Sequence, residues 1–194
     1  MSSTRRRTGR RPGSTDTREQ IAAAARRLFA DAGYERATFR AIAAEAGVDP
    51  ALVVHFFGSK EELFRQVMGL PPAVADGLAA IAEAPGEERG RRLAALVVGA
   101  LENPATRPIL LGRIRSASSH PDAAALVREN VTRDLARLTA SISDENAEER
   151  AVMLGSLVVG VALARYVVLV EPLASMQPEQ VVDLIAPAFQ LYLA

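Results

Sequence analysis

Apolar residues near the start of the chain recur with the spacing of one face of an α-helix. Ile21, Ala25, Leu28 and Phe29 fall at i, i+4, i+7 and i+8, positions that share a face when each turn holds 3.6 residues. This spacing predicts a helix over residues 17–32. A half-buried strand would instead need alternating apolar and polar residues, and we find no such run of useful length. The pattern therefore predicts an all-α fold.

Polar residues and glycines at fixed offsets mark the predicted helix ends. Thr17 and Gln20 are spaced as a capping box for the first helix, and Gly33 suits its end. Ser59 and Glu62 are spaced in the same way, so a further helix is predicted to begin directly after Ser59. Proline, glycine and asparagine breaks divide the rest into helices predicted over about residues 39–46, 50–57, 72–84, 86–102, 105–117, 121–141, 145–170 and 178–193.

Residues 38–60 read TFRAIAAEAGVDPALVVHFFGSK. Thr38 is a good N-cap for a short helix that Gly47 ends. Asp49 then caps a second helix that has Pro50 at its first position, where a missing N–H costs nothing. Two short helices around a tight turn form the helix-turn-helix pattern, whose second helix can enter the major groove of DNA.

Residues 17–61 resemble the DNA-binding domain of the tetracycline-repressor (TetR) family of bacterial regulators. The resemblance rests on LFADAGYERAT, the AGV turn and the exit HFFGSKEELF, and it covers about a quarter of the chain. It implies a three-helix helix-turn-helix DNA-binding domain followed by a helical ligand-binding and dimerisation domain. We expect an arm over residues 1–14, a DNA-binding head over residues 15–70 and a ligand-binding, dimerising body over residues 71–194.

The resemblance makes the second helix of the motif the recognition helix. Candidate DNA contacts on this helix and beside it are Thr38, Arg40, Pro50, Ala51, Val54, His55, Ser59 and Lys60. Lys60 would lie in the first turn of a helix, where free N–H groups already favour a phosphate. His55 could donate to a base edge or a phosphate, or it could be a packed ring that bonds a backbone carbonyl.

The recognition helix departs from the family pattern. Family members often carry Lys or Arg near position 50, Thr near 52 and Tyr at 54, where this chain has Pro50, Leu52 and Val54. Ala51 and Val54 can touch thymine methyl groups but offer little hydrogen-bond readout. Arginines in the arm could compensate from a narrow minor groove. These are Arg5, Arg6, Arg7, Arg10 and Arg11.

Charge is unevenly placed although the formal net charge is zero. Residues 1–65 hold 12 Lys and Arg against 8 Asp and Glu, and residues 66–194 hold 11 against 15. This asymmetry indicates a nucleic-acid contact near the N-terminus, although the five arm arginines alone could account for it. The sequence has no cysteine, so we expect no disulfide and no thiolate metal site. The N-terminus lacks an apolar signal segment, and we expect a cytoplasmic protein.

Catalytic motifs are missing from the sequence. The two histidines, His55 and His120, belong to different segments. We find no glycine-rich phosphate loop, no nucleophile elbow and no carboxylate pair with metal-ligand spacing. We therefore expect no enzyme activity, no metal and no cofactor.

Residues 151–170 read AVMLGSLVVGVALARYVVLV, with Arg165 as the single charge. Such a run could span a membrane, but we favour a helix buried in a bundle or between subunits. The resemblance implies that the last two helices of each subunit pair in a homodimer. Candidate interface residues on them are Gly155, Gly160, Val161, Ala164, Val181, Ile185 and Phe189.

Polar residues inside the apolar helices of the body are candidates for a ligand site. The four main candidates are Arg113, Asn130, Arg165 and Tyr166; Arg115 and Arg133 are further ones. A structural salt bridge remains an open role for each of them. The Leu, Val and Ala around them indicate an apolar cavity of the kind that binds small molecules.

These observations favour a ligand-responsive transcriptional regulator, a repressor rather than an activator. It would bind a palindromic double-stranded DNA operator as a homodimer, and an unknown small-molecule effector would control it. The alternative is a helical small-molecule-binding dimer with weak or lost specific DNA binding. The apolar residues at positions 50, 52 and 54 favour this alternative.

Overall fold

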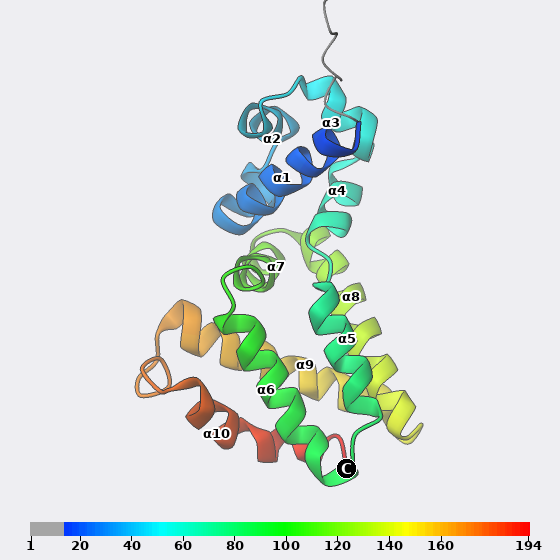
Figure 1. Ribbon diagram of the computed structural model, residues 1–194, viewed down its shortest axis with the longest axis vertical. Coiled ribbons are helices and arrows are strands. Elements are labelled where there is room, and N and C mark those ends of the chain that lie inside the picture. Colours follow the sequence, from blue (N-terminus) through cyan, green and yellow to red (C-terminus); the bar gives the residue numbers. More distant parts are fainter. Residues whose placement is uncertain (1–13) are drawn as a thin grey trace, which may run out of the picture.

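Helices make up the architecture of the part of the chain that the structure describes. The computed structural model describes residues 14–194, apart from the side chains of residues 14, 15 and 130–132. No strand occurs in this part of the chain, so the all-α class is confirmed. Figure 1 shows α1–α4 as a head at one end and α5–α10 as a larger body at the other. In chain order the elements are α1 (Ser14–Arg36), α2 (Phe39–Ala46), α3 (Pro50–Phe57), α4 (Lys60–Val67), α5 (Pro72–Ala82), the 3-10 turn η1 (Gly86–Glu88), α6 (Arg89–Glu102), α7 (Arg107–Ser119), α8 (Pro121–Ile142), α9 (Ala147–Leu163), the π turn η2 (Ala164–Val168) and α10 (Pro178–Leu191).

Local capping fixes the three short helices of the head. The side chains of Thr38, Asp49 and Ser59 accept a backbone N–H in the first turn of α2, α3 and α4, over 3.2, 2.8 and 3.1 Å. Gly47 follows α2 in the left-handed conformation, with φ of 67°, which glycine adopts without a Cβ clash. Each side-chain cap contributes about 0.5–2 kcal/mol. The bounds of α2 and α3 are those that the sequence pattern predicts.

An aromatic cluster holds the long helix α1 against α4. Phe29, Tyr34 and Phe64 are at most 2% exposed. The ring of Phe64 meets those of Phe29 and Tyr34 edge-on, with centroids 5.0 and 5.2 Å apart. Such edge-to-face pairs add roughly 0.5–1.5 kcal/mol to the free energy gained by burying the rings. The cluster therefore gives the head a core of its own, on which the small helices α2 and α3 rest.

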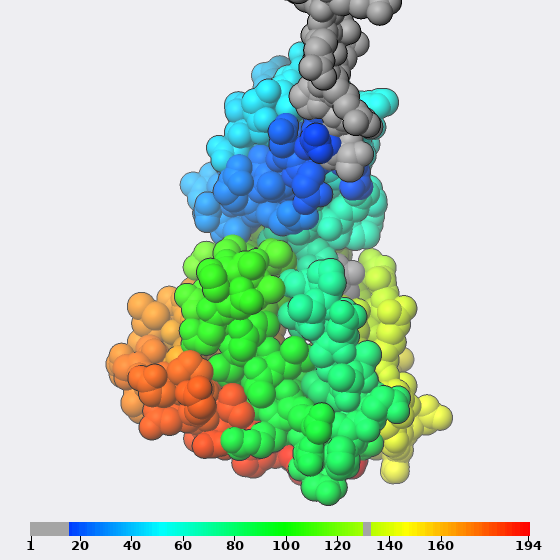
Figure 2. Space-filling view, in the orientation of Figure 1, coloured from blue at the N-terminus to red at the C-terminus, as the bar shows by residue number. Residues whose placement is uncertain are grey.

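The body touches the head through α7 and α8. Helix α7 runs along α1, so closely that a Cβ atom at Gly112 would lie 2.8 Å from Cα of Ala30. Helix α8 begins against the head, where Ala123 is buried in the head's apolar core. The ring of His120, which caps α8, lies 4.9 Å from that of Tyr34. Figure 2 shows the narrower head above the broader body. A shift of α7 or α8 would therefore reach α1 directly.

The body is organised around the packing of α6 on α10. A Cβ atom at Gly90 would lie 2.6 Å from the backbone nitrogen of Gln190, so only glycine allows this approach. The N–H of Gly90 donates to the side chain of Gln190 over 2.7 Å. Because van der Waals contact and hydrogen bonding coincide here, α10 is fixed to the body and cannot act as a loose tail.

Some helix ends differ from the predictions. Helix α1 begins at Ser14, so Thr17 lies inside it and the capping box of Thr17 and Gln20 is wrong. A three-residue spacing identifies a cap only where the helix begins, and here helical backbone already precedes it. Gly33 does break α1, with φ of 77°. Ser59 caps α4, but Glu62 bonds Arg65 and Gln66 and leaves the box half-formed.

The predicted helix over residues 145–170 is shorter and changes form. Helix α9 ends at Leu163 and continues as the π turn η2 to Val168. Ala147–Val168 is long and apolar enough to cross a membrane by length and composition alone, a test that core helices also pass. In the described structure, 28% of its most apolar window is buried. Much of this apolar helix is therefore left uncovered by the described part of the chain.

Candidate nucleic-acid interface and body cavity

Helix α3 presents its outer face to solvent. Val53 and Phe57 are 0% and 3% exposed and anchor the helix to the head's core. Pro50, Ala51 and His55 are exposed, and Val54 is 49% exposed. Helix α3 therefore has two faces. One face packs against the core of the head, and the other is exposed and can contact a partner.

His55 belongs to the outward face of α3. Its ring is exposed and meets the half-buried ring of Phe56 edge-on, with centroids 5.2 Å apart. Among the described residues it makes no hydrogen bond to a carbonyl, so the interpretation of His55 as a packed core ring is wrong. The imidazole nitrogens are thus available to donate to or accept from a partner.

Thr38 and Ser59 flank α3 at the ends of the neighbouring helices. Each hydroxyl oxygen accepts a bond as an N-cap. A cap and a phosphate contact are compatible at Thr38, because its O–H can still donate. The hydroxyl of Ser59 also bonds the carboxylate of Glu61 and helps to lower the pKa of that carboxyl group, so a phosphate would have to compete for it. Arg40 is exposed on α2, and it forms no ion pair within the described part of the chain.

Lys60 has a role inside the head. Its Nζ donates to the carbonyl oxygen of Glu35 over 3.1 Å and lies 4.5 Å from the ring centroid of Tyr34. Burial lowers the pKa of Lys60, and the charges of Glu61 and Glu35 offset part of this effect. Lys60 therefore ties the start of α4 to α1, and a phosphate would have to compete with these contacts.

Tyr34 completes the same corner of the head. Its hydroxyl donates to Glu61 over 3.3 Å. Burial, together with the carboxylate of Glu61, raises the pKa of Tyr34 to about 12. The phenol thus stays neutral at physiological pH and serves as a fixed donor beneath Lys60.

The head is not basic without the arm. Residues 14–65 hold seven Lys and Arg against eight Asp and Glu. The predicted arm contacts lie outside the described residues: Arg5, Arg6, Arg7, Arg10 and Arg11. The excess of positive charge in residues 1–65 therefore comes from the five arginines of the arm. This agrees with the alternative that these arginines alone account for the charge asymmetry.

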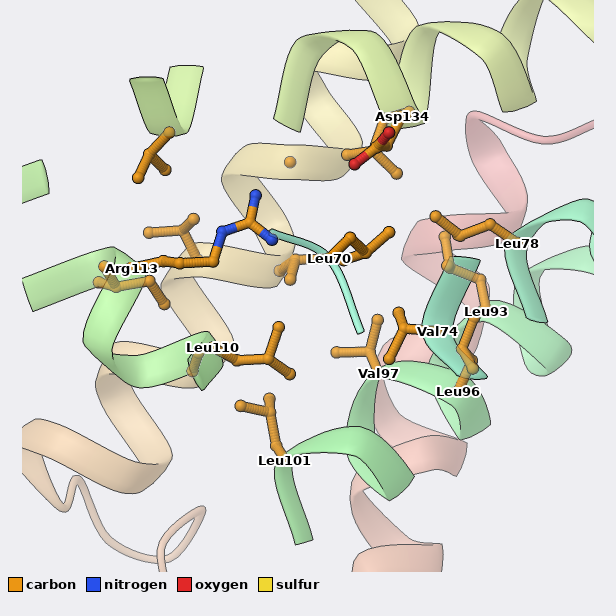
Figure 3. Close-up of a pocket in the computed structure, with 17 residues that line it drawn as sticks. Leu70, Val74, Leu78, Leu93, Leu96, Val97, Leu101, Leu110, Arg113 and Asp134 are labelled. Carbon is orange, nitrogen blue, oxygen red and sulfur yellow. The ribbon is translucent and has the colours of Figure 1, made fainter. Parts of the chain in front are cut away.

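Leu70 and helices α5–α9 border a partly open cavity of about 130 Å³ in the body. Among the 17 described residues that line it, Arg113 and Asp134 carry charge and the other 15 are aliphatic or glycine. Figure 3 shows the guanidinium of Arg113 reaching from α7 into the space beside Leu70 and Leu110. Such a chamber, apolar with few polar groups, is typical of small-molecule sites.

Arg113 is a buried cation without a full set of partners. It is 4% exposed, and its Nη2 has no hydrogen-bond partner in the described structure. Burial lowers the pKa of Arg113, and the charge of Asp134 partly offsets this. Asp134 lines the same cavity, yet the two side chains form no ion pair. Leaving such a donor unsatisfied costs about 1–3 kcal/mol.

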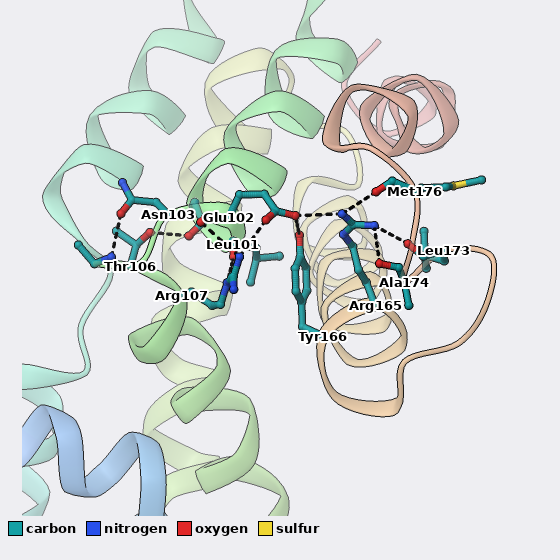
Figure 4. A network of polar contacts seen from close by, with 12 residues as sticks. Leu101, Glu102, Asn103, Thr106, Arg107, Arg165, Tyr166, Leu173, Ala174 and Met176 are labelled. Carbon is teal, nitrogen blue, oxygen red and sulfur yellow. Dashed lines mark hydrogen bonds and ion pairs between the residues drawn. The ribbon is translucent and has the colours of Figure 1, made fainter.

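Two other predicted ligand residues lie elsewhere. Arg165 and Tyr166 do not line the cavity, so their assignment to it is wrong. The π turn directs Arg165 toward the carbonyls of residues 173–176, including that of Met176 over 2.9 Å. Glu102 accepts from Arg165 over 3.0 Å and from Tyr166 over 2.8 Å (Figure 4). These residues link α6, η2 and the loop before α10 and form a structural clamp.

Electrostatics within the clamp favour the ion pair. Burial acts to raise the pKa of Glu102, but hydrogen bonds from Tyr166 and Arg165 and the charges of Arg165 and Arg107 outweigh it, so the pKa is lowered. Arg107 adds an ion pair to Glu102 at 2.8 Å. Glu102 therefore stays ionised and serves both arginines.

The remaining polar candidates contribute nothing to the cavity as described. Arg115 is exposed on α7, and Arg133 is exposed and pairs with Glu129 on α8. The side chain of Asn130 lies outside the described residues. Of the polar candidates that can be placed, Arg113 alone lines the cavity.

The face assigned to the dimer on α10 is wrong. Val181, Ile185 and Phe189 are 0%, 8% and 0% exposed inside the core of the single chain, so they cannot form a surface. Gly155 is buried as well and lines the cavity, so its assignment to the interface is also wrong. The period of 3.6 places the opposite face of α10 outside.

The other candidate residues for the dimer interface are exposed or half-buried. Gly160 is exposed, and a Cβ atom there would meet nothing within 4 Å. Val161 and Ala164 are half-buried. Large apolar side chains are exposed on and around α9, η2 and α10: Val152, Met153, Val167, Val168, Leu169, Val170, Leu184 and Leu191.

No pattern in the sequence predicted a role for Asp134, Glu102 or Gly112. Asp134 and Glu102 resemble ordinary solvated acids, because nothing local marks the helix face on which they fall. Gly112 stands directly before Arg113. A glycine inside a helical pattern costs about 1 kcal/mol relative to alanine and often has a packing reason, so Gly112 is the signal that could have drawn attention to this stretch.

A helix-turn-helix head on an all-helical body with an internal cavity defines a class of transcriptional regulators. Residues 21–67 match the family profile "Bacterial regulatory proteins, tetR family". Residues 87–193 match "Tetracyclin repressor-like, C-terminal domain". The second match alone covers more than half of the chain. This protein therefore belongs to the TetR family of bacterial transcriptional regulators.

Individual relatives agree with this assignment. The crystal structure of a TetR-family regulator from Streptomyces coelicolor A3 is 36% identical, with a TM-score of 0.72 over 96% of this chain and 99% of its own. The HTH-type transcriptional repressor AcnR of Corynebacterium glutamicum is 44% identical over 50 residues, 26% of this chain and 27% of the repressor. The chain thus matches about a quarter of AcnR's length. The fatty acid degradation regulator FadR from Bacillus halodurans, 18% identical with a TM-score of 0.64 over 95% of this chain and 97% of its own, shares the fold.

Proposed function

We propose that this regulator binds a palindromic DNA operator as a homodimer and that a small molecule in the body cavity controls the binding. The observation that carries this proposal is the division of α3 into a buried face and a free one. Val53 and Phe57 hold the helix firmly, while Ala51, Val54 and His55 project outward. A rigid helix with a free face suits insertion into a major groove.

Contacts to DNA would fall into two groups. Ala51 and Val54 would touch thymine methyl groups, and His55 would donate to a base edge or phosphate. Thr38, Arg40, Ser59 and Lys60 would fix the register on the phosphates. Two-fold symmetry would place the recognition helices about one turn of DNA apart, roughly 34–36 Å or somewhat more.

Dimerisation would use the apolar surface left uncovered on α9, η2 and α10. Val168, Leu169 and Leu191 are 66%, 64% and 72% exposed in the single subunit, which is costly unless a partner covers them. Gly160 lies in open space on the same helix pair and would let a second helix approach closely. Val161 and Ala164 would line the border of this contact.

Helix α7 would carry the effector's signal. Arg113 on this helix faces the cavity, and the neighbouring Gly112 abuts α1 of the head. An effector that binds one position of α7 better than another would shift the spacing of the two heads. Repression is the proposed direction of control, in keeping with the name of the AcnR relative.

The alternative function is a small-molecule-binding dimer with weak or lost specific DNA binding. The apolar face of α3 and the near-neutral described head favour it. A gel shift against the DNA upstream of the protein's own gene separates the two. The proposal predicts a discrete shifted band that competitor DNA of random sequence does not remove. A smear that any DNA removes would support the alternative.

A further inference from the structure

The cavity combines a hydrocarbon wall with one incompletely paired cation, and this limits what can fill it. A hydrocarbon would satisfy the aliphatic lining but leave Nη2 of Arg113 unpaired, as it is now in the described structure. A cation would meet the guanidinium at close range in a medium of low dielectric. A carboxylate supplies two acceptor oxygens that match the planar fork of arginine.

Asp134 restricts the charge of the occupant. It lines the same cavity as Arg113, and its field already favours the guanidinium. A second anionic group on the ligand would meet this carboxylate as a like charge, which is unfavourable in a desolvated site. One negative charge is therefore the amount that the pair of residues accommodates.

Volume restricts the body of the occupant. The cavity measures about 130 Å³, and an engineered protein cavity of about 150 Å³ lined by Leu, Ile and Phe binds benzene. The described space therefore suits a single ring or a short branched chain.

We infer that the effector is a small organic monoanion, a carboxylate on a single ring or a short branched hydrocarbon, which pairs with Arg113. The inference rests on the proposed function only in calling this molecule the effector, because binding to the cavity and release of DNA are measured separately. Arg113 sets the specificity for the anion, and the aliphatic lining sets the size.

Calorimetry on the full-length protein tests the ligand class with four probes that share one ring: benzoate, benzyl alcohol, benzylamine and phthalate. Benzoate should bind, and benzyl alcohol should bind about 30-fold more weakly or worse, as expected when one partner of a buried charge pair is absent. Benzylamine should bind more weakly than benzoate, because its ammonium group would lie close to the guanidinium of Arg113 even though Asp134 lines the same cavity. Phthalate should also bind more weakly than benzoate. Benzoate that fails to bind, or binds no better than benzyl alcohol, overturns the inference.

Two variants test the residue. Arg113→Met keeps an unbranched chain and removes the buried charge, so it should lose the preference for benzoate while still binding benzyl alcohol. Arg115→Met is the matched control on the same helix, because Arg115 is exposed, and it should bind benzoate as the native protein does. An Arg113→Met protein that keeps the benzoate preference contradicts the inference. If that variant does not fold by circular dichroism, the four probes on the native protein still decide.

Asp134→Asn sharpens the charge argument. It should raise the affinity for both anions and raise that for phthalate more, because the like charge is removed. An unchanged ratio of the two affinities counts against the single-charge limit. Operator binding is measured in parallel with and without benzoate. If benzoate binds through Arg113 but does not change operator affinity, the ligand site is supported. The proposed control of DNA binding by the ligand is then refuted.

Discussion

The head and the body are both helical, but their proposed binding sites form in different ways. In the head, side-chain caps within three residues of each helix start fix α2, α3 and α4, and the surface proposed to bind DNA faces outward. In the body, five successive helices, α5–α9, border the cavity with residues that range from Leu70 to Ala162, and the charged side chains of Arg113 and Asp134 line it. The head is thus specified locally and meets a large partner, whereas the body's site exists only once distant helices have packed.

This difference also appears in how each region treats its cations. Lys60 of the head is half-buried, yet it has a carbonyl and an aromatic ring as partners. Arg113 of the body is almost fully buried, and its Nη2 has no partner in the described structure. A satisfied cation stabilises its own domain, while an unsatisfied one favours a ligand that completes it.

The largest expected effect concerns the body's outer face. Gly160→Arg should place a charge where a second subunit is proposed to pack and should yield monomers. Operator affinity should then fall by at least about 100-fold, because the second half-site no longer binds intramolecularly. Analytical ultracentrifugation measures the first effect and fluorescence anisotropy the second.

Gly99→Arg is the matched control for that experiment. Gly99 is also exposed in a helix, and a Cβ atom there would meet nothing within 4 Å. It lies on α6, which carries none of the exposed large apolar side chains that are proposed to form the dimer contact. Its variant should stay dimeric. If Gly160→Arg sediments as the native dimer does, the interface lies elsewhere.

A second prediction concerns the arm. Deleting residues 1–13 should weaken DNA binding by roughly tenfold or more, since five arginines that can release counterions are removed. The loss should be larger for operators with A·T-rich flanks, where the minor groove is narrow. Anisotropy on matched operators with A·T-rich and G·C-rich flanks measures it. Equal affinities of both proteins for both operators would leave the arm without a role.

A third prediction concerns the flanks of the recognition helix. Arg40→Ala and Lys60→Ala should each weaken binding about equally for all DNA sequences, because each removes a phosphate contact from both half-sites. The salt slope should fall by about one unit for every phosphate that is no longer neutralised. Arg92→Ala is the control, because Arg92 is exposed on the body and pairs with Glu88. A variant that changes base preference but keeps its salt slope would show that its side chain reads bases.

The smallest expected effect lies at the seam between head and body. Gly112→Ala places a Cβ atom 2.8 Å from Cα of Ala30, so α1 and α7 must separate slightly, at a cost of about 1–3 kcal/mol. Gly99→Ala should instead stabilise by about 0.5–1 kcal/mol, because its site is open and alanine favours helix. Urea unfolding compares them. Equal urea midpoints for the two variants would mean that α1 and α7 are not closely packed at Gly112.

The sequence predicted the head more accurately than the body. Thr38, Gly47, Asp49 and Ser59 act through neighbours within a few residues, so α2 and α3 could be placed from the pattern alone. Contacts with distant helices decide the rest. Arg113 and Arg165 both stand in apolar helices, and only packing shows that one faces the cavity and the other a loop.

Apolar helices gave the least reliable predictions of surface. Residues on every side of α9 are apolar, so the sequence could not show that Gly155 faces inward and Gly160 outward. On α10 the most regular apolar stripe, which includes Val181 and Phe189, is the subunit's own core. The strongest hydrophobic pattern on a helix marks the face buried first, and an interface between subunits uses what remains.

The most direct test of specific operator binding is the selection of genomic DNA fragments by the purified protein and by Val54→Glu. Val54 is 49% exposed on α3, so the glutamate should leave the fold unchanged and repel DNA in the groove. We predict that the native protein enriches fragments sharing one palindromic sequence and that Val54→Glu enriches none. Equal, sequence-independent recovery by both proteins would contradict specific operator binding by α3.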